Sequence, residues 1–218
     1  MKSDTFPFDI LDDSHHLLTI LEQHQVTHPV MSEVLSRHRA LHDKLTEQRQ
    51  IGEHALEEWR TALAQRWKCE IGVQRLYASI QRQLYDYFGA DAHFFEIIAP
   101  ATEGQPRTAN DLLADLRRLK ASLALIHPQP PFASEWLPRL ATASAELSAA
   151  LAQTVQCETQ RRQASVGRRL IGNAYQRARE QTYRLLGEYL GEELIIESNR
   201  RLETSASLDI VETGKNPD

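Results

Sequence analysis

The sequence contains few of the residues that interrupt helices or cross-link a chain. Its 218 residues include two cysteines, nine glycines and nine prolines. Cys69 and Cys157 lie in separate helix-like stretches and neither has a CxxC partner, which indicates two buried or half-buried free thiols in a reducing cytoplasm. No proline occurs from Ser32 to Phe88, so no residue in that stretch forces a helix to end.

Long apolar runs are also missing. No segment approaches eighteen consecutive apolar residues, so we expect no membrane insertion. The first residues, MKSDTFPFDILDD, contain no apolar run flanked by positive charge. We therefore expect no signal peptide and a cytoplasmic location. The formal net charge of -5 does not favour binding to nucleic acid or to an anionic membrane.

Motifs for catalysis and cofactor binding are absent from the sequence. There is no Gly-rich phosphate loop ending in Gly-Lys, no Gly-x-Ser-x-Gly elbow and no Glu-x-x-His pair. Neither cysteine has the local sequence of a nucleophile. We therefore expect no catalytic residues, no cofactor and no metal ligands, and we favour a protein that is not an enzyme.

Helix-forming residues dominate what remains. Leu, Ala, Glu, Gln and Arg are abundant and β-branched residues are sparse. Apolar periodicity predicts two short helices, at 9–24 and 111–126, and two long helical segments, at 32–88 and 134–197. In the first long segment the apolar spacing is close to the 3.5-residue repeat of a coiled coil. Trp59 and Trp67 share one face, and we expect them to pack in the core with Trp136.

Each long segment allows two interpretations. The first is either one continuous helix or a hairpin that turns near Gly52. In the second, the apolar face moves around the helical wheel. That shift indicates either a break near 156–165 or a helix that is buried on two sides.

The strongest architectural signal is an internal sequence similarity, which we call the echo. Tyr77–Ile98 reads YASIQRQLYDYFGADAHFFEII, and Tyr175–Ile196, 98 positions later, reads YQRAREQTYRLLGEYLGEELII. This pairs Tyr77 with Tyr175 and Gly89 with Gly187. The echo predicts an all-α, elongated antiparallel bundle of two similar helical units related by a pseudo-twofold axis. The predicted division is a first helical unit at 1–105, a second at 106–203 and a disordered tail at 204–218.

The histidines offer a metal-like spacing of four residues, at His38 and His42 and again at His24 and His28. His38 and His42 are four residues apart, so they share a helix face and could hold a metal. A di-iron bundle requires Glu-x-x-His twice, and this chain has none. We interpret the two histidines as exposed side chains on a polar face.

Positive charge is concentrated in one stretch, 161–184. It contains seven arginines against the single acid Glu180, a local charge of 7 − 1 = +6. The candidate polyanion contacts are Arg161, Arg162, Arg168, Arg169, Arg177 and Arg184. On a helical wheel most of these arginines lie opposite Leu170 and Ala178, which favours the solvated face of an amphipathic helix.

Three functions remain open from the sequence. The leading hypothesis is a non-enzymatic intracellular scaffold or partner-binding module, either self-associating or bound to another protein. The alternative is a polyanion or nucleic-acid binder that uses 161–184. The least favoured is a metal-dependent helical-bundle enzyme that uses His38 and His42. Because of the net charge, we expect no binding of DNA, RNA or polyphosphate near physiological salt.

Overall fold

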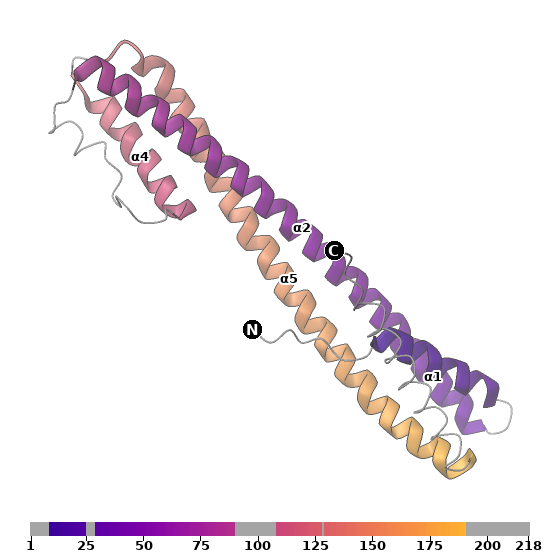
Figure 1. Ribbon diagram of the computed structural model, residues 1–218. Helices are drawn as coiled ribbons and strands as arrows, with labels where there is room; N and C mark the ends of the chain where they lie inside the picture. The colour runs from indigo at the N-terminus through magenta and orange to yellow at the C-terminus, as the bar shows by residue number, and fades with distance from the viewer. Residues whose placement is uncertain (1–8, 25–28, 90–107, 128, 191–218) are drawn as a thin grey trace, which may run out of the picture. The chain divides into compact units, whose positions relative to one another are not determined.

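The computed structural model describes residues 9–24, 29–89, 108–127 and 129–190 (Figure 1). Four α-helices occupy these ranges: α1 (Ile10–His24), α2 (Pro29–Phe88), α4 (Ala109–Leu125) and α5 (Ala133–Leu190). No strand occurs within them, so the predicted all-α fold is confirmed. The predicted tail at 204–218 and the last residues of both echo segments lie outside the described ranges.

Each long segment forms a single helix. α2 has 60 residues and continues through Gly52, so the hairpin interpretation is wrong. α5 has 58 residues and continues through 156–165, so the proposed break is also wrong. A single glycine inside a helix costs only about 1 kcal/mol relative to alanine, which the packing of a long helix readily offsets.

Two helix ends follow from the local sequence. α2 ends at Gly89, whose φ of 73° belongs to the left-handed region, and the Gly89 N–H donates to the Tyr85 carbonyl over 2.9 Å. Thr108 caps α4: its hydroxyl accepts from the Asp111 N–H over 3.2 Å, and its own N–H donates to Asp111 Oδ2 over 2.9 Å. This reciprocal pair is a capping box, which satisfies backbone donors at the start of the helix.

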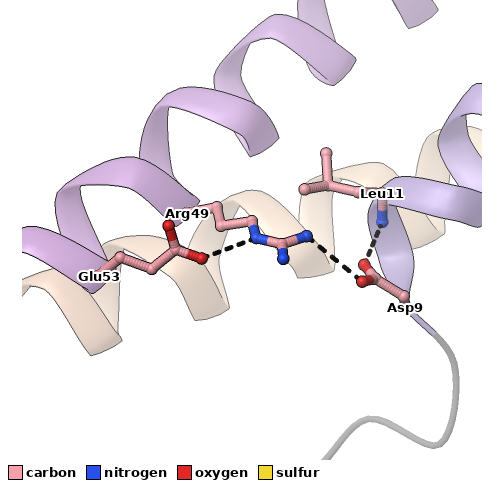
Figure 2. Close-up of polar contacts among 4 residues, drawn as sticks. All are labelled: Asp9, Leu11, Arg49 and Glu53. Atoms are coloured by element: carbon pink, nitrogen blue, oxygen red, sulfur yellow. Dashed lines mark hydrogen bonds and ion pairs between the residues drawn. The ribbon is translucent and has the colours of Figure 1, made fainter.

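The start of α1 is held by one aspartate. Asp9 Oδ1 accepts from the Leu11 N–H over 3.0 Å, as an N-cap side chain does. Arg49 of α2 lies 3.4 Å from Asp9 Oδ2 through Nη1, and its Nε lies 2.9 Å from Glu53 Oε1 (Figure 2). Both ion pairs are exposed to solvent, so each contributes little to stability, and only the pair with Asp9 connects α2 to the start of α1.

The chain divides into two compact units. Unit 1 comprises residues 1–53 and 163–218, and unit 2 comprises residues 54–162. Within the described ranges, unit 1 holds α1, the first part of α2 and the last part of α5. Unit 2 holds α4, the last part of α2 and the first part of α5. Each compact unit therefore draws on both of the helical units predicted at 1–105 and 106–203, whose boundaries stay a prediction.

Unit 2 has the larger apolar core. Leucines on one face of α4 pack against the end of α2 and the start of α5. The buried members include Val73, Tyr77, Ile80, Leu84, Leu112, Leu116, Leu119, Leu123, Trp136, Leu140 and Leu147. The Trp136 indole N–H donates to the Gln83 side chain, so the ring is buried with its polar atom satisfied.

Unit 1 has a smaller apolar cluster. It combines α1 with the start of α2 and the end of α5, through Leu17, Leu18, Leu21, Met31, Leu35 and Leu186. Arg37 of α2 donates to Gln181 of α5 over 3.3 Å. An early residue of α2 thus meets a late residue of α5, and the two helices run antiparallel here.

Burial in the two short helices follows the same pattern. In α1 the buried positions include Asp13, Ser14, Leu17 and Leu21. In α4, 102 positions later in each case, they include Asp115, Leu116, Leu119 and Leu123. The echo residues Tyr77 and Tyr175 are also both buried. A duplication would produce this correspondence, and the duplication itself stays a prediction.

Candidate functional site

A set of polar side chains lies inside unit 1. We call it the polar network, and it consists of Asp13, Ser14, His38, His42, Tyr175, Arg179 and Thr182. The α5 members are spaced at i, i+4 and i+7, which places them on one face of the helix. That face meets α1 and α2, so the network occupies the space where three helices pack together.

Asp13 is the acidic centre of the network. The Tyr175 hydroxyl donates to Asp13 Oδ2 over 2.8 Å, and Arg179 Nε lies 2.7 Å from the same oxygen. Burial and the neighbouring Asp13 carboxylate raise the pKa of Tyr175 far above its usual value, so the phenol stays protonated and remains a donor. The second oxygen, Asp13 Oδ1, is buried and has no hydrogen-bond partner among the described residues.

His38 is among the three most enclosed members, together with Ser14 and Tyr175. Its exposed fraction is 1%, and its Nε2 lies 2.7 Å from Thr182 Oγ1. Burial, followed by the charge of Arg37, lowers the pKa of His38 below 6.5, although the Ala178 backbone and Asp13 act in the opposite direction. The ring packs edge-on against Tyr175, with the centroids 6.0 Å apart. The interpretation of His38 as an exposed histidine is therefore wrong, because Thr182 gives the buried ring a polar partner.

His42 lies one turn along α2 and is half-buried. Its Nδ1 lies 3.1 Å from the Ser14 hydroxyl of α1, so the exposed interpretation is wrong here too. The two histidines therefore contact different helices instead of converging on one point. Within the ranges that the structure describes, no three His, Cys, Asp or Glu side chains are placed to hold a metal ion. The arrangement supplies no ligand set for the metal-enzyme hypothesis.

Unit 2 has an apolar pair where the echo places the His38–Thr182 pair. Leu140 stands 102 positions after His38, and Leu84 stands 98 positions before Thr182. Both leucines have an exposed fraction of 0% and belong to the core of unit 2. Unit 2 does keep a buried aspartate, Asp115, which forms an ion pair with Arg118. At these two paired positions, a buried polar pair is therefore found in unit 1 and an apolar pair in unit 2.

The predicted polyanion contacts do not share one environment. Arg161 is half-buried and lies over the Trp59 ring, 4.7 Å from its centroid. Arg162 is exposed and forms an ion pair with Glu158, one turn earlier on α5. The remaining four are exposed: Arg168, Arg169, Arg177 and Arg184.

Two exposed apolar side chains lie among these arginines in the sequence, and the apolar pattern of the sequence did not predict their exposure. Val166 is 55% exposed and Leu170 is 63% exposed. The helical wheel predicted that Leu170 lies opposite most of the arginines, on the covered face. That prediction is wrong, because Leu170 is exposed. Their spacing of four residues was visible in the sequence, but a wheel does not reveal which face is covered. We define the outer face of α5 as the exposed residues Val166, Arg169, Leu170, Arg177 and Arg184, all in unit 1.

Unit 2 contains a cavity of about 520 Å³ next to α4 and α5. Alanine and serine side chains line most of it, including Ala121, Ala141 and Ser144, with Arg117 and Lys120 also in the lining.

No protein-family model, curated protein or solved structure matches this chain. The fold therefore defines the class of the protein. It is an all-α helical bundle with a buried polar network in one of its two compact units. Among the helices described above, none is long and apolar enough to cross a membrane.

Proposed function

We propose that this protein is a non-enzymatic scaffold that works in the cytoplasm and binds a protein partner through the outer face of α5. The observation that carries the proposal is the exposure of Val166 and Leu170 between arginines on one helix face. Apolar side chains gathered on a surface and rimmed by polar groups are typical of protein interaction sites. Arginine is also enriched at such interfaces.

The chemistry of the face favours an acidic, amphipathic helix as the partner. Val166 and Leu170 are one turn apart, so they offer a pair of apolar contacts to a helix lying alongside. Arg177 and Arg184 lie further along the same face and form no ion pair with another described residue, while Glu180 is the one acid between them in the sequence. Carboxylates on the partner would pair with these guanidinium groups and fix its register.

The test compares a face variant with a matched control on the same helix. The face variant is Leu170→Glu/Arg177→Glu. The control is Val155→Glu, because Val155 is 64% exposed and lies in unit 2. Affinity capture from the native host should recover a partner with the wild type and the control, and lose it with the face variant. Equal recovery with all three proteins would contradict the proposal.

Self-association is the other form of this function, with a second copy of the chain as the partner. Sedimentation of the purified protein over a concentration series separates the two. A rise in mass that the face variant abolishes identifies the second copy as the partner. A constant monomer mass, together with a captured protein, identifies a different chain.

A second candidate, a polyanion binder, is favoured by the exposed arginines on α5. Each arginine that contacts a phosphate on duplex DNA should add about −0.9 to the log–log salt slope of the affinity. Fluorescence anisotropy across a salt series, with Arg168→Glu/Arg169→Glu as the control, measures this. We expect no binding near 0.15 M salt, where the Debye length is about 8 Å. Sub-micromolar binding that the double variant abolishes would favour the polyanion function instead.

A further inference from the structure

The two compact units carry side chains of different polarity at positions that the echo pairs. Unit 1 has His38 hydrogen-bonded to Thr182, and unit 2 has Leu140 and Leu84 at the positions that the echo pairs with them. We infer that unit 1 is a pH-sensitive switch: protonation of His38 loosens the packing of α1 and α5 in unit 1, while unit 2 stays packed. This inference does not depend on the proposed partner.

The geometry around His38 satisfies only one ring nitrogen. Nε2 lies 2.7 Å from Thr182 Oγ1, whereas Nδ1 is buried and has no hydrogen-bond partner among the described residues. A neutral imidazole carries one N–H and one acceptor nitrogen, and a charged imidazolium carries two N–H groups. Protonation therefore adds a charge and leaves Nδ1 as a buried donor with no hydrogen bond among the described residues, even though the Ala178 backbone favours the charged ring. Leaving such a group unsatisfied is costly in a packed interior.

The charged groups around His38 act on its protonation in both directions. Arg37 precedes it on α2, and its charge acts against protonation. Arg179 on α5 lies in the same network and is bound to Asp13. Asp13 on α1 is the one nearby acid that favours protonation, but Tyr175 and Arg179 already contact its Oδ2.

Other titratable side chains face the same region. His42 on α2 lies beside His15 on α1, with the ring centroids 6.2 Å apart. His16 on α1 has a buried Nε2 without a hydrogen-bond partner in the part of the chain that the structure describes. Tyr175 on α5 remains neutral. The variants at His38 leave these side chains in place, so a pH response that survives those variants does not come from His38.

The direction of the pH effect follows from linkage. Burial and Arg37 lower the pKa of folded His38 below the ordinary value of 6.5. The unfolded chain therefore binds the proton more tightly than the folded chain does. The stability that neutral His38 supports is fully present above about pH 6.5 and is lost as the pH falls toward the lowered pKa. Within that window the equilibrium constant for opening unit 1 should rise as the pH falls, and the uptake of one proton limits the rise to at most about tenfold per pH unit.

Hydrogen exchange on the full chain measures this opening. Amide protection, corrected for intrinsic exchange rates, is compared at pH 7.5 and pH 5.5. We expect protection in α1 and in the last part of α5 to fall below pH 6.5, by at most about tenfold per pH unit, while protection in α4 stays constant. The three tryptophans, Trp59, Trp67 and Trp136, all lie in unit 2. Their fluorescence should stay unchanged over the same range.

The decisive variant places the unit 2 pair in unit 1. His38→Leu/Thr182→Leu removes the titrating ring and should abolish the pH-dependent loss of protection in α1. If the double variant does not fold, His38→Gln takes its place, because glutamine can still hydrogen-bond to Thr182 and does not titrate. His54→Gln is the control: His54 is exposed and lies in unit 2, so the response of unit 1 should persist.

Two results would overturn the inference. One is a pH-dependent loss of protection in α1 that survives the removal of His38. The other is an equal loss in both units, which would identify a general acid effect rather than a switch in unit 1. Neither result bears on partner capture by the outer face of α5, so the two proposals fail separately.

Discussion

The Tyr175 hydroxyl donates a hydrogen bond of 2.8 Å to Asp13, which joins residues 162 positions apart in the sequence. Arg179, one turn further along α5, forms an ion pair with the same carboxylate. α1 has only 15 residues, a length at which an isolated helix is marginal in water. The contacts of Asp13 with α5 therefore contribute to holding α1 in unit 1.

Removing the Tyr175 hydroxyl should destabilise unit 1. Tyr175→Phe leaves a buried carboxylate oxygen with one partner fewer, and we expect a loss of about 1–3 kcal/mol in the free energy of opening. Hydrogen exchange of α1 measures this loss. Tyr87→Phe is the control, since Tyr87 is exposed and lies in unit 2. Equal effects of the two variants would show that the hydrogen bond to Asp13 does not stabilise α1.

The face of α4 that packs against α2 and α5 should dominate the stability of unit 2. Leu116 has an exposed fraction of 0%, whereas Leu125 on the same helix is 77% exposed. We expect Leu116→Ala to cost about 2–5 kcal/mol and Leu125→Ala less than about 0.5 kcal/mol. Urea unfolding followed by tryptophan fluorescence reports on this unit. Similar midpoints for the two variants would contradict the observed orientation of α4.

Alanine substitutions at Gly52, inside α2, and at Gly89, directly after α2, should change the free energy of unfolding in opposite directions. Gly89 has a φ of 73°, so Gly89→Ala forces a left-handed alanine and should destabilise the helix end by about 1 kcal/mol. A Cβ at Gly52 would meet no atom within 4 Å, so Gly52→Ala should stabilise α2 by about 0.5–1 kcal/mol. Urea unfolding followed by circular dichroism measures both. A destabilising Gly52→Ala would argue against a continuous helix there.

The capping box of α4 should make its first turn sensitive to substitution and to acid. Thr108→Ala removes the side-chain cap and should cost about 1 kcal/mol, measured by hydrogen exchange in α4. Thr159→Ala is the control: Thr159 is exposed in the middle of α5 and donates only to the Val155 carbonyl, so its loss should be nearly neutral.

The acid sensitivity follows from Asp111. Hydrogen bonds from the Thr108 side chain and backbone hold the pKa of Asp111 below 3.8. The contribution of the cap is therefore present at neutral pH and lost as the pH falls through the lowered pKa. Thr108→Ala removes the side-chain hydrogen bond and keeps the backbone one, so it should reduce this acid-dependent component, and an unchanged pH profile would show that the threonine side chain does not contribute to it.

Local chemistry made most of the helices predictable. Gly89 and Thr108 determine helix ends through their own backbone and side-chain preferences, which any sequence window contains. Apolar spacing located α1 and α4 to within two residues of their observed ends. The continuity of α2 through Gly52 was left open, because one glycine allows either a turn or an uninterrupted helix.

The candidate site depended on contacts that a sequence window does not contain. His38 is buried because Thr182, 144 positions away, offers a hydrogen bond. Trp67 was expected in the core but is 63% exposed. Small residues such as Ala55 and Ala62 occupy the buried positions of α2 instead. Close approach of two helices favours small side chains between them, so large apolar residues can remain outside.

The two compact units differ in when their residues are made during synthesis. Unit 2 is one continuous stretch, 54–162, whereas unit 1 needs both the stretch that ends at residue 53 and the one that begins at residue 163. A ribosome adds about 5–20 residues per second, so Leu186 is made roughly ten to thirty seconds after Leu21, its partner in the core of unit 1. Throughout that interval the apolar face of α1 on the nascent chain lacks Leu186, whereas the last residue of unit 2 is made before Leu186 is. The apolar face of α1 is therefore open to a nascent-chain chaperone until the end of α5 has been made.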